Sequence, residues 1–308
     1  MISFLKKQLY VLAAIFLLPA CGLQVQSQVD SLLDVLENTH SDSIKIDCYL
    51  KISKNYLSQN MADSSLLYAQ KGIELAKKAG IKPDIRFYRN QISANDMKGE
   101  YEIAAMLHDP VIKLLSNSSD PDEQAWLKNY EGWRSFRHGE FTKSIEAFEK
   151  AKIMAEDLGN TDILSDAYLG LGRVYLGLED YELEAINYER YLEIVDISVN
   201  KRQSYFVLTR LADIQRESQQ YDESVVTYQK LIDLARASND SLRVASTLNR
   251  MAWGYYQAGR LEESLEVYLK DLEISKQIKD KRLIGNCLGN IGNIYRDWNY
   301  FEKAIEYY

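Results

Sequence analysis

The residue types that usually carry out chemistry are few in this chain of 308 residues. Its three histidines and three cysteines do not stand at the short intervals that metal ligation requires. No glycine-rich loop follows a strand pattern, as phosphate binding would need. The acidic pair Glu262-Glu263 could transfer protons only if a cleft raised the pKa of one carboxyl. The sequence therefore predicts a protein that is not an enzyme and that uses neither a metal ion nor a cofactor.

An internal repeat of forty residues predicts the structural elements that would position any binding residues. Large side chains recur in two ladders that run seven residues apart. The first ladder is Tyr101, Phe141, Tyr181, Tyr221, Leu261 and Phe301, and the second is Tyr68, His108, Phe148, Tyr188, Tyr228, Tyr268 and Tyr308. A period between about 20 and 50 residues is typical of one supersecondary unit stacked on copies of itself. The ladders therefore predict a solenoid.

Small residues between the ladders indicate that each unit is a helical hairpin. Short side chains follow the first ladder by three residues, at Ala104, Ser144, Ser224, Ser264 and Ala304, with Glu184 as the exception. A third ladder lies on the preceding helix, at Gly132, Gly172, Ala212, Ala252 and Gly292. Because small residues on facing helices let the two axes approach closely, this pattern favours antiparallel helix pairs and an all-α fold.

Two segments, 251–268 with Trp253-Gly254-Tyr255-Tyr256 and 291–308 with Ala304-Ile305, resemble the tetratricopeptide repeat. The resemblance covers roughly residues 45–308 and implies a right-handed superhelical solenoid of about seven helix pairs, the last one truncated. The usual unit of about 34 residues is lengthened here to forty. Such long units are similar to those of peptide-responsive regulators and of the extracytoplasmic sensor regions of bacterial signalling proteins. The resemblance implies a binding scaffold.

Some side chains on the first helix of each unit are not needed for packing and are free to contact a ligand on the concave face. The residues at these offsets are Arg89, Trp126, Asn129, Trp133, Arg137, Arg173, Phe206, Asp213, Arg216, Asn249, Trp253, Tyr256, Asn293 and Arg296. Aromatic and arginine side chains are enriched at binding hot spots. The sequence therefore predicts a groove for a protein or peptide, and the arginines favour a peptide with a carboxylate.

A second interpretation of these residues stays open. The aromatic side chains, such as Trp126, Trp133 and Phe206, would then pack between adjacent first helices. Arginines such as Arg173 and Arg216 would be solvated or salt-bridged.

The second unit is the weakest copy of the repeat. Pro110 removes a backbone donor from its second helix, and the turn-rich stretch that ends at Asp122 follows. We therefore expect residues 108–122 to form a hinge within the solenoid of residues 28–308.

The N-terminal segment predicts export. Lys6 and Lys7 precede an apolar run, Leu9–Leu18, that is too short to span a bilayer but has the length of a signal-peptide core. Residues 1–27 are therefore a predicted signal peptide, cleaved after Ser27. The alternative is lipidation of Cys21, which would anchor the protein in the membrane; without it we expect a periplasmic protein.

The net charge of the chain limits the classes of partner that it can bind. A formal charge of −8, which becomes more negative when residues 1–27 are removed, argues against nucleic acid and against anionic membranes. The acidic surface also keeps an exported scaffold in solution, and this is its simplest explanation.

Cys48 and Cys287 stand near opposite ends of the stack, too far apart for a disulfide, and both are expected to be buried thiols.

The C-terminal segment predicts an incomplete stack. About ten residues follow the last first helix, so we expect Leu288, Ile291, Ile294 and Tyr295 to be poorly covered and the chain to self-associate through this end.

Two function classes stay open. The first is a cell-envelope scaffold that binds a protein or peptide, as the sensor part of a longer signalling protein. The second is a secreted or lipid-anchored structural assembly factor without a small ligand.

Overall fold

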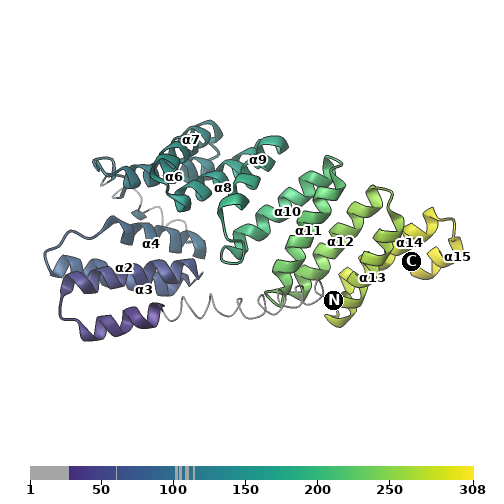
Figure 1. Ribbon diagram of the computed structural model, residues 1–308, viewed down its shortest axis with the longest axis horizontal. Helices are drawn as coiled ribbons and strands as arrows, with labels where there is room; N and C mark the ends of the chain where they lie inside the picture. Colours follow the sequence, from purple (N-terminus) through teal and green to yellow (C-terminus); the bar gives the residue numbers. More distant parts are fainter. Residues whose placement is uncertain (1–27, 60, 101–102, 104–105, 108–110, 114) are drawn as a thin grey trace, which may run out of the picture. The chain divides into compact units, whose positions relative to one another are not determined.

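The computed structural model describes residues 28–59, 61–100, 103, 106–107, 111–113 and 115–308 (Figure 1). The predictions for the signal segment, Cys21, Tyr101, Ala104 and His108 lie outside these residues. Every regular element in the described chain is a helix, and the predicted all-α solenoid of helix pairs is confirmed. Among these helices none combines the length and the apolar character that a membrane crossing requires.

The chain divides into two compact units, one that ends at Ser119 and one that spans Asp120–Tyr308. The boundary falls inside the segment 108–122, whose role as a hinge stays a prediction. Unit 1 contains a helix at residues 28–38, followed by α2 (Asp42–Ser58), α3 (Ala62–Lys78) and α4 (Ile85–Lys98).

Unit 1 is out of phase with the forty-residue ladder by one residue, so Tyr68 does not occupy the buried position that Phe148 has in unit 2. The fully buried position on α3 belongs to Ala69, and Tyr68 is half-buried and stacks on Tyr56 with ring centroids 5.6 Å apart. The interior contact of this hairpin is made by Ser65, whose carbonyl accepts a hydrogen bond of 3.0 Å from the Ser53 hydroxyl. A single shifted residue turns a helical side chain by about 100°, which is enough to move it off the core.

Unit 2 is a regular stack of hairpins in which consecutive helices pack on one another (Figure 1). Its first helices are α6 (Pro121–Arg137), α8 (Thr161–Gly177), α10 (Lys201–Glu217), α12 (Ser241–Gln257) and α14 (Lys281–Asp297). Its second helices are α7 (Phe141–Leu158), α9 (Tyr181–Ile194), α11 (Tyr221–Arg236), α13 (Leu261–Gln277) and α15 (Phe301–Tyr307). Each second helix therefore begins at a residue of the first ladder.

The second ladder forms the core of unit 2. Its four members on α7 to α13 have no exposed surface: Phe148, Tyr188, Tyr228 and Tyr268. Their rings occupy the space that small residues leave open, because a Cβ on Gly172 would lie 2.3 Å from the Tyr188 ring. The serines that follow the first ladder by three residues connect the two helices of a hairpin. Their hydroxyls donate to the carbonyl oxygen of the facing small residue, as in Ser144 to Gly132 (2.8 Å).

Glu184 departs from the ladder of small residues for a reason that lies in the next repeat. Its carboxylate is fully buried and receives two hydrogen bonds of 2.9 Å from Nε and Nη2 of Arg210 on α10. A buried carboxylate requires a partner of this kind, because an unpaired one would be strongly destabilising.

The turn inside each hairpin of unit 2 also follows the period. One residue in each turn has a positive φ, between 59° and 74°, at Gly139, Glu179, Gln219, Gly259 and Asn299. A left-handed residue ends the first helix and reverses the chain.

The C-terminal prediction is wrong for two of its residues. Ile291 and Ile294 are fully buried, while Leu288 and Tyr295 are partly buried. The short α15 is sufficient to cover them, since Tyr307 stacks on Tyr295 with centroids 5.3 Å apart. The exposed apolar side chains of this region lie on α15 and at its two ends, at Tyr300, Phe301, Ile305 and Tyr308.

Candidate functional site

The predicted binding residues fall on one kind of element. Arg89 lies on α4 of unit 1, and every other predicted residue lies on a first helix of unit 2. We call the face formed by these side chains on α6, α8, α10, α12 and α14 the first-helix surface.

Contacts between neighbouring repeats join this surface into a continuous layer. Nη1 of Arg216 on α10 donates to Oε1 of Gln257 on α12 at 2.7 Å. Nη1 of Arg250 on α12 donates to Oδ2 of Asp213 on α10 at 2.6 Å. The Tyr256 hydroxyl donates to a carboxylate oxygen of Asp297 on α14. The structure thus brings the predicted residues of α10, α12 and α14 together.

Several of the predicted arginines already have partners within the chain. Arg216 is only 14% exposed and also donates to Glu217 at 2.9 Å. Arg296 donates to Asp297 at 2.9 and 3.0 Å and to Asn293 at 3.3 Å. For these residues the salt-bridged interpretation describes the side chains as the structure holds them.

The N-terminal part of the surface is organised around Asp166 on α8. Asn129 Nδ2 and Trp133 Nε1, both from α6, donate to its Oδ2 at 2.6 and 2.8 Å. Burial raises the pKa of Asp166 above the usual carboxyl value, although these two bonds and the charge of Arg173 act in the opposite direction. Asn129 is a buried residue, only 5% exposed, so little of it is accessible to a ligand.

Arg173 connects three first helices through its guanidinium. Its Cζ lies 5.8 Å from the centroid of the Trp133 ring on α6 and 4.7 Å from the centroid of the Phe206 ring on α10. Such distances allow cation–π attraction to both rings. The packing interpretation therefore applies to Trp133 and Phe206 only in part, because the object they pack against is a cation.

The aromatic side chains at the other positions are stacked in pairs along their helices. Trp253 and Tyr256 on α12 stack with centroids 5.1 Å apart at 15°, and Trp253 is 37% exposed. Trp126 and Tyr130 on α6 stack in the same way, at 5.1 Å and 7°. A stacked, partly exposed pair offers a rigid apolar area to a ligand.

Asn249 turns away from the first-helix surface toward a buried carboxylate on α13. Its Nδ2 donates to Oδ2 of Asp271 at 2.9 Å, and the same oxygen accepts from Sγ of Cys287 at 2.8 Å. Ser275 donates to Oδ1 at 2.9 Å. Burial raises the pKa of Cys287, and the bond to Asp271 adds to the effect. The expected burial of both Cys48 and Cys287 is confirmed, and neither forms a disulfide.

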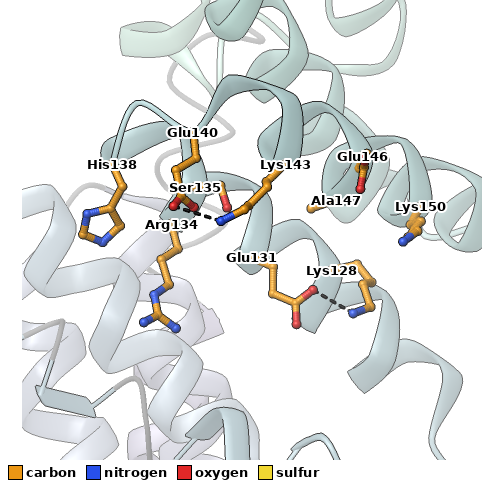
Figure 2. Close-up of a pocket in the computed structure, with 10 residues that line it drawn as sticks. All are labelled: Lys128, Glu131, Arg134, Ser135, His138, Glu140, Lys143, Glu146, Ala147 and Lys150. Atoms are coloured by element: carbon orange, nitrogen blue, oxygen red, sulfur yellow. Dashed lines mark hydrogen bonds and ion pairs between the residues drawn. The ribbon is translucent and has the colours of Figure 1, made fainter.

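A charged hollow of about 530 Å³ lies between α6 and α7, away from the predicted residues (Figure 2). Its lining residues are Lys128, Glu131, Arg134, Ser135, His138, Glu140, Lys143, Glu146, Ala147 and Lys150. Figure 2 shows two internal ion pairs, Lys128 with Glu131 at 2.7 Å and Lys143 with Glu140 at 3.0 Å. Exposed ion pairs contribute little binding energy. This hollow is therefore a weaker candidate for a ligand site than the first-helix surface.

The sequence interpretation missed the acids that organise the surface. Asp166 stands forty residues from both Trp126 and Phe206, and Asp297 stands forty residues from Gln257. The repeat offset was therefore the signal that could have found them, although they differ in type from the residues at the same offset.

Comparison with known proteins identifies the repeat. Residues 205–277 and 286–308 match two sequence profiles, each described as tetratricopeptide repeat. No curated protein matches the sequence.

Solved structures share the fold at low identity. The apo form of RapI is 12% identical, with a TM-score of 0.67 over 85% of this chain and 74% of its own. NprR in complex with its cognate peptide NprX is 16% identical, with a TM-score of 0.51 over 85% and 76%. A Rap protein complexed with competence and sporulation factor is 11% identical, with a TM-score of 0.50 over 85% and 74%.

Proposed function

We propose that this helical repeat protein, which matches the tetratricopeptide repeat over residues 205–277 and 286–308, is a non-enzymatic scaffold that binds a protein or peptide. The ligand lies along the first-helix surface of unit 2. The observation that carries this proposal is the set of residues at one repeat position, Trp133, Arg173, Asp213, Trp253 and Asn293. A position that only packed would hold similar side chains in every copy, as the second ladder does, whereas this one changes in size and charge from copy to copy.

Peptide binding is favoured over binding of a small molecule by the shape of the surface. The polar and aromatic groups extend over successive helices, and adjacent repeats are joined by side-chain bonds such as that from Arg216 to Gln257. An extended surface of this kind suits an extended ligand. Two of the similar structures are complexes: NprR with its cognate peptide NprX, and a Rap protein with competence and sporulation factor.

The experiment is a binding screen of residues 28–308 against an array of short randomised peptides, with two variants beside the parent. Trp253→Ala combined with Arg216→Ala should remove binding, because it deletes the exposed ring that stacks on Tyr256 and the arginine that packs beside Gly254. Exposed Leu269→Ala combined with Arg190→Ala, on second helices, is the matched control and should bind as the parent does.

Helical circular dichroism must be unchanged in both double variants. Loss of helix in the first variant would show that its side chains serve the core, and the assignment of that pair to binding would then fail. Equal binding by both folded variants would contradict the first-helix surface as the ligand site.

We also propose that the protein is exported, on the strength of the apolar run Leu9–Leu18 behind Lys6 and Lys7. Its finer role is that of the sensor part of a longer signalling protein, and a structural assembly factor is the alternative. Mass spectrometry of the mature N-terminus separates cleavage after Ser27 from acylation at Cys21. An N-terminus at Met1 in purified envelope fractions would contradict both.

A further inference from the structure

The guanidinium of Arg173, a partly buried side chain on α8, differs from those of four other arginines on the first helices of unit 2. Arg210, Arg216, Arg250 and Arg296 each donate to a side chain that the structure describes. Within the described residues, Arg173 makes no hydrogen bond or ion pair, and its Nε is buried without a partner. A partly buried cation with unused donors is unfavourable unless a partner arrives, so this group is available for a ligand.

The position of Arg173 is fixed before any ligand binds. Trp133 belongs to the preceding first helix, α6, and Phe206 to the following one, α10. Their ring centroids lie 5.8 and 4.7 Å from the Cζ of Arg173. Trp133 is itself held by its bond to Asp166 and by an edge contact with Phe148 at 5.3 Å. Phe206 has an edge contact with Tyr188 at 6.0 Å. A guanidinium held by packed rings loses little entropy when it binds.

The acidic side chains around Arg173 already have other partners. Asp166 on its own helix is engaged by Asn129 and Trp133 rather than by Arg173. Glu184 on α9 is engaged by Arg210. The Tyr188 hydroxyl of α9, which is buried and without a hydrogen bond in the described chain, is close enough for the charge of Arg173 to act on it. Because both carboxylates are already engaged, neither of them pairs with Arg173 in the described chain.

From this arrangement we infer that Arg173, flanked by Trp133 and Phe206, is the binding site for one carboxylate of a peptide ligand. The carboxylate belongs either to the C-terminus of the peptide or to an Asp or Glu side chain. Paired N–H donors of the guanidinium match the two carboxylate oxygens. This inference rests on the proposed function and narrows it to a class of ligand.

The test uses residues 28–308 and a fluorescent library of short randomised peptides in four forms. These forms have a free C-terminus, a C-terminal amide, Asn and Gln in place of all acidic residues, and phosphoserine in place of serine. We expect a carboxylate to strengthen binding by about tenfold or more, as hydrogen bonds to charged groups do. Loss of affinity on amidation identifies the C-terminus, and loss on removal of acidic side chains identifies those side chains.

Three variants tie the effect to Arg173. Arg173→Gln should remove the preference for carboxylates, and Arg173→Lys, which keeps the charge without the planar fork, should reduce it. Arg190→Gln is the control, because Arg190 is exposed on α9 and paired with Glu193 at 2.8 Å. If Arg173→Gln fails to fold by circular dichroism, Arg173→Lys alone decides.

The outcomes separate this inference from the proposed function. Peptides that bind equally well with and without carboxylates, or a preference that survives in the Arg173 variants, would overturn the inference and leave peptide binding intact. A preference for phosphoserine would overturn it as well. If no peptide binds in any form, both the inference and the proposed function are wrong.

Discussion

At the scale of single residues, the second ladder separates the role of a buried ring from the role of its hydroxyl. Tyr188, Tyr228 and Tyr268 are all fully buried. The hydroxyl of Tyr228 donates to Oδ1 of Asp213 at 2.6 Å, whereas those of Tyr188 and Tyr268 have no hydrogen-bond partner in the described chain. The same side chain is therefore satisfied at one repeat and unsatisfied at the next.

Removal of single atoms should expose this difference. Tyr228→Phe should lower the free energy of unfolding by about 1.5–3 kcal/mol, since it deletes a bond to a charged acceptor. Tyr188→Phe should leave it unchanged or raise it, because the lost hydroxyl had no partner. Urea unfolding followed by circular dichroism measures both, and Tyr228→Ala, expected to cost about 3–5 kcal/mol, sets the upper limit. Equal losses in the two Phe variants would contradict the hydrogen-bond assignment.

A second residue-scale feature is the carboxylate of Asp271, which is buried and has no cation beside it among the described residues. Burial raises its pKa, while the bonds from Cys287, Asn249 and Ser275 act in the opposite direction. A carboxyl whose pKa rises on folding holds its proton more tightly in the folded chain. The stability that this group contributes is present below its ordinary pKa of about 3.9 and is lost as the pH rises through the raised value.

Replacement of this carboxyl should therefore make the free energy of unfolding less dependent on pH over part of the acidic range. Relative to Asp271→Asn, the parent should become less stable as the pH rises from about 3.9 toward the raised pKa. Urea midpoints of both proteins across this range give the difference. Asp233→Asn, which changes an exposed carboxylate on α11, is the control. A constant difference between the parent and Asp271→Asn would show that the pKa of Asp271 is not raised.

At the scale of helices, close approach of first and second helices depends on glycine at a few positions. Gly172 on α8 faces the Tyr188 ring of α9 at a distance that excludes a Cβ. Gly285 on α14 has no heavy atom within 4 Å of the place where its Cβ would stand. The two glycines lie on equivalent elements but in opposite environments.

The same substitution should therefore have opposite signs on these two helices. Gly172→Ala should destabilise unit 2 by about 1–3 kcal/mol through overpacking against Tyr188. Gly285→Ala should stabilise it by up to about 1 kcal/mol, because alanine is the better helix former. Thermal unfolding followed by circular dichroism reports both shifts. A lower midpoint for Gly285→Ala would show that this face of α14 is covered.

Periodicity predicted the helices of unit 2 well because repetition reports a geometry that every copy must satisfy. Phe141, Tyr181 and Tyr221 stand at the first position of α7, α9 and α11. The period does not extend to the packing of Tyr68, where a shift of one residue leaves the spacing nearly intact but turns the side chain. The pairing of Glu184 with Arg210 was also beyond reach, because a contact made once carries no period.

At the scale of the whole molecule, two strongly exposed apolar side chains stand together on α15. Phe301 and Ile305 are 59% and 74% exposed and stand four residues apart, on one face of the helix. Exposed apolar side chains that adjoin one another promote association. This surface, rather than α14, is the place where self-association is expected.

Light scattering of residues 28–308 at increasing concentration tests that expectation. The parent should show a mass above that of a monomer, and Ile305→Glu should restore the monomer because a charge on this face opposes its burial. Ile153→Glu, at an exposed position on α7, is the control and should behave as the parent does. A parent that stays monomeric at high concentration would remove the case for assembly through α15.

The buried pair of Glu184 and Arg210 has a consequence for how such a chain can change its length. Tandem repeats gain and lose whole units by recombination, and a solenoid accepts this when each junction resembles the next. The junction of α9 with α10 does not resemble the others. A unit inserted between these helices, or loss of the unit that holds α10, would leave a buried carboxylate without its partner, at a cost of about 3–5 kcal/mol. Units can be exchanged more freely where serine occupies the same position, as at Ser144, Ser224 and Ser264, because no charge is then left without its partner.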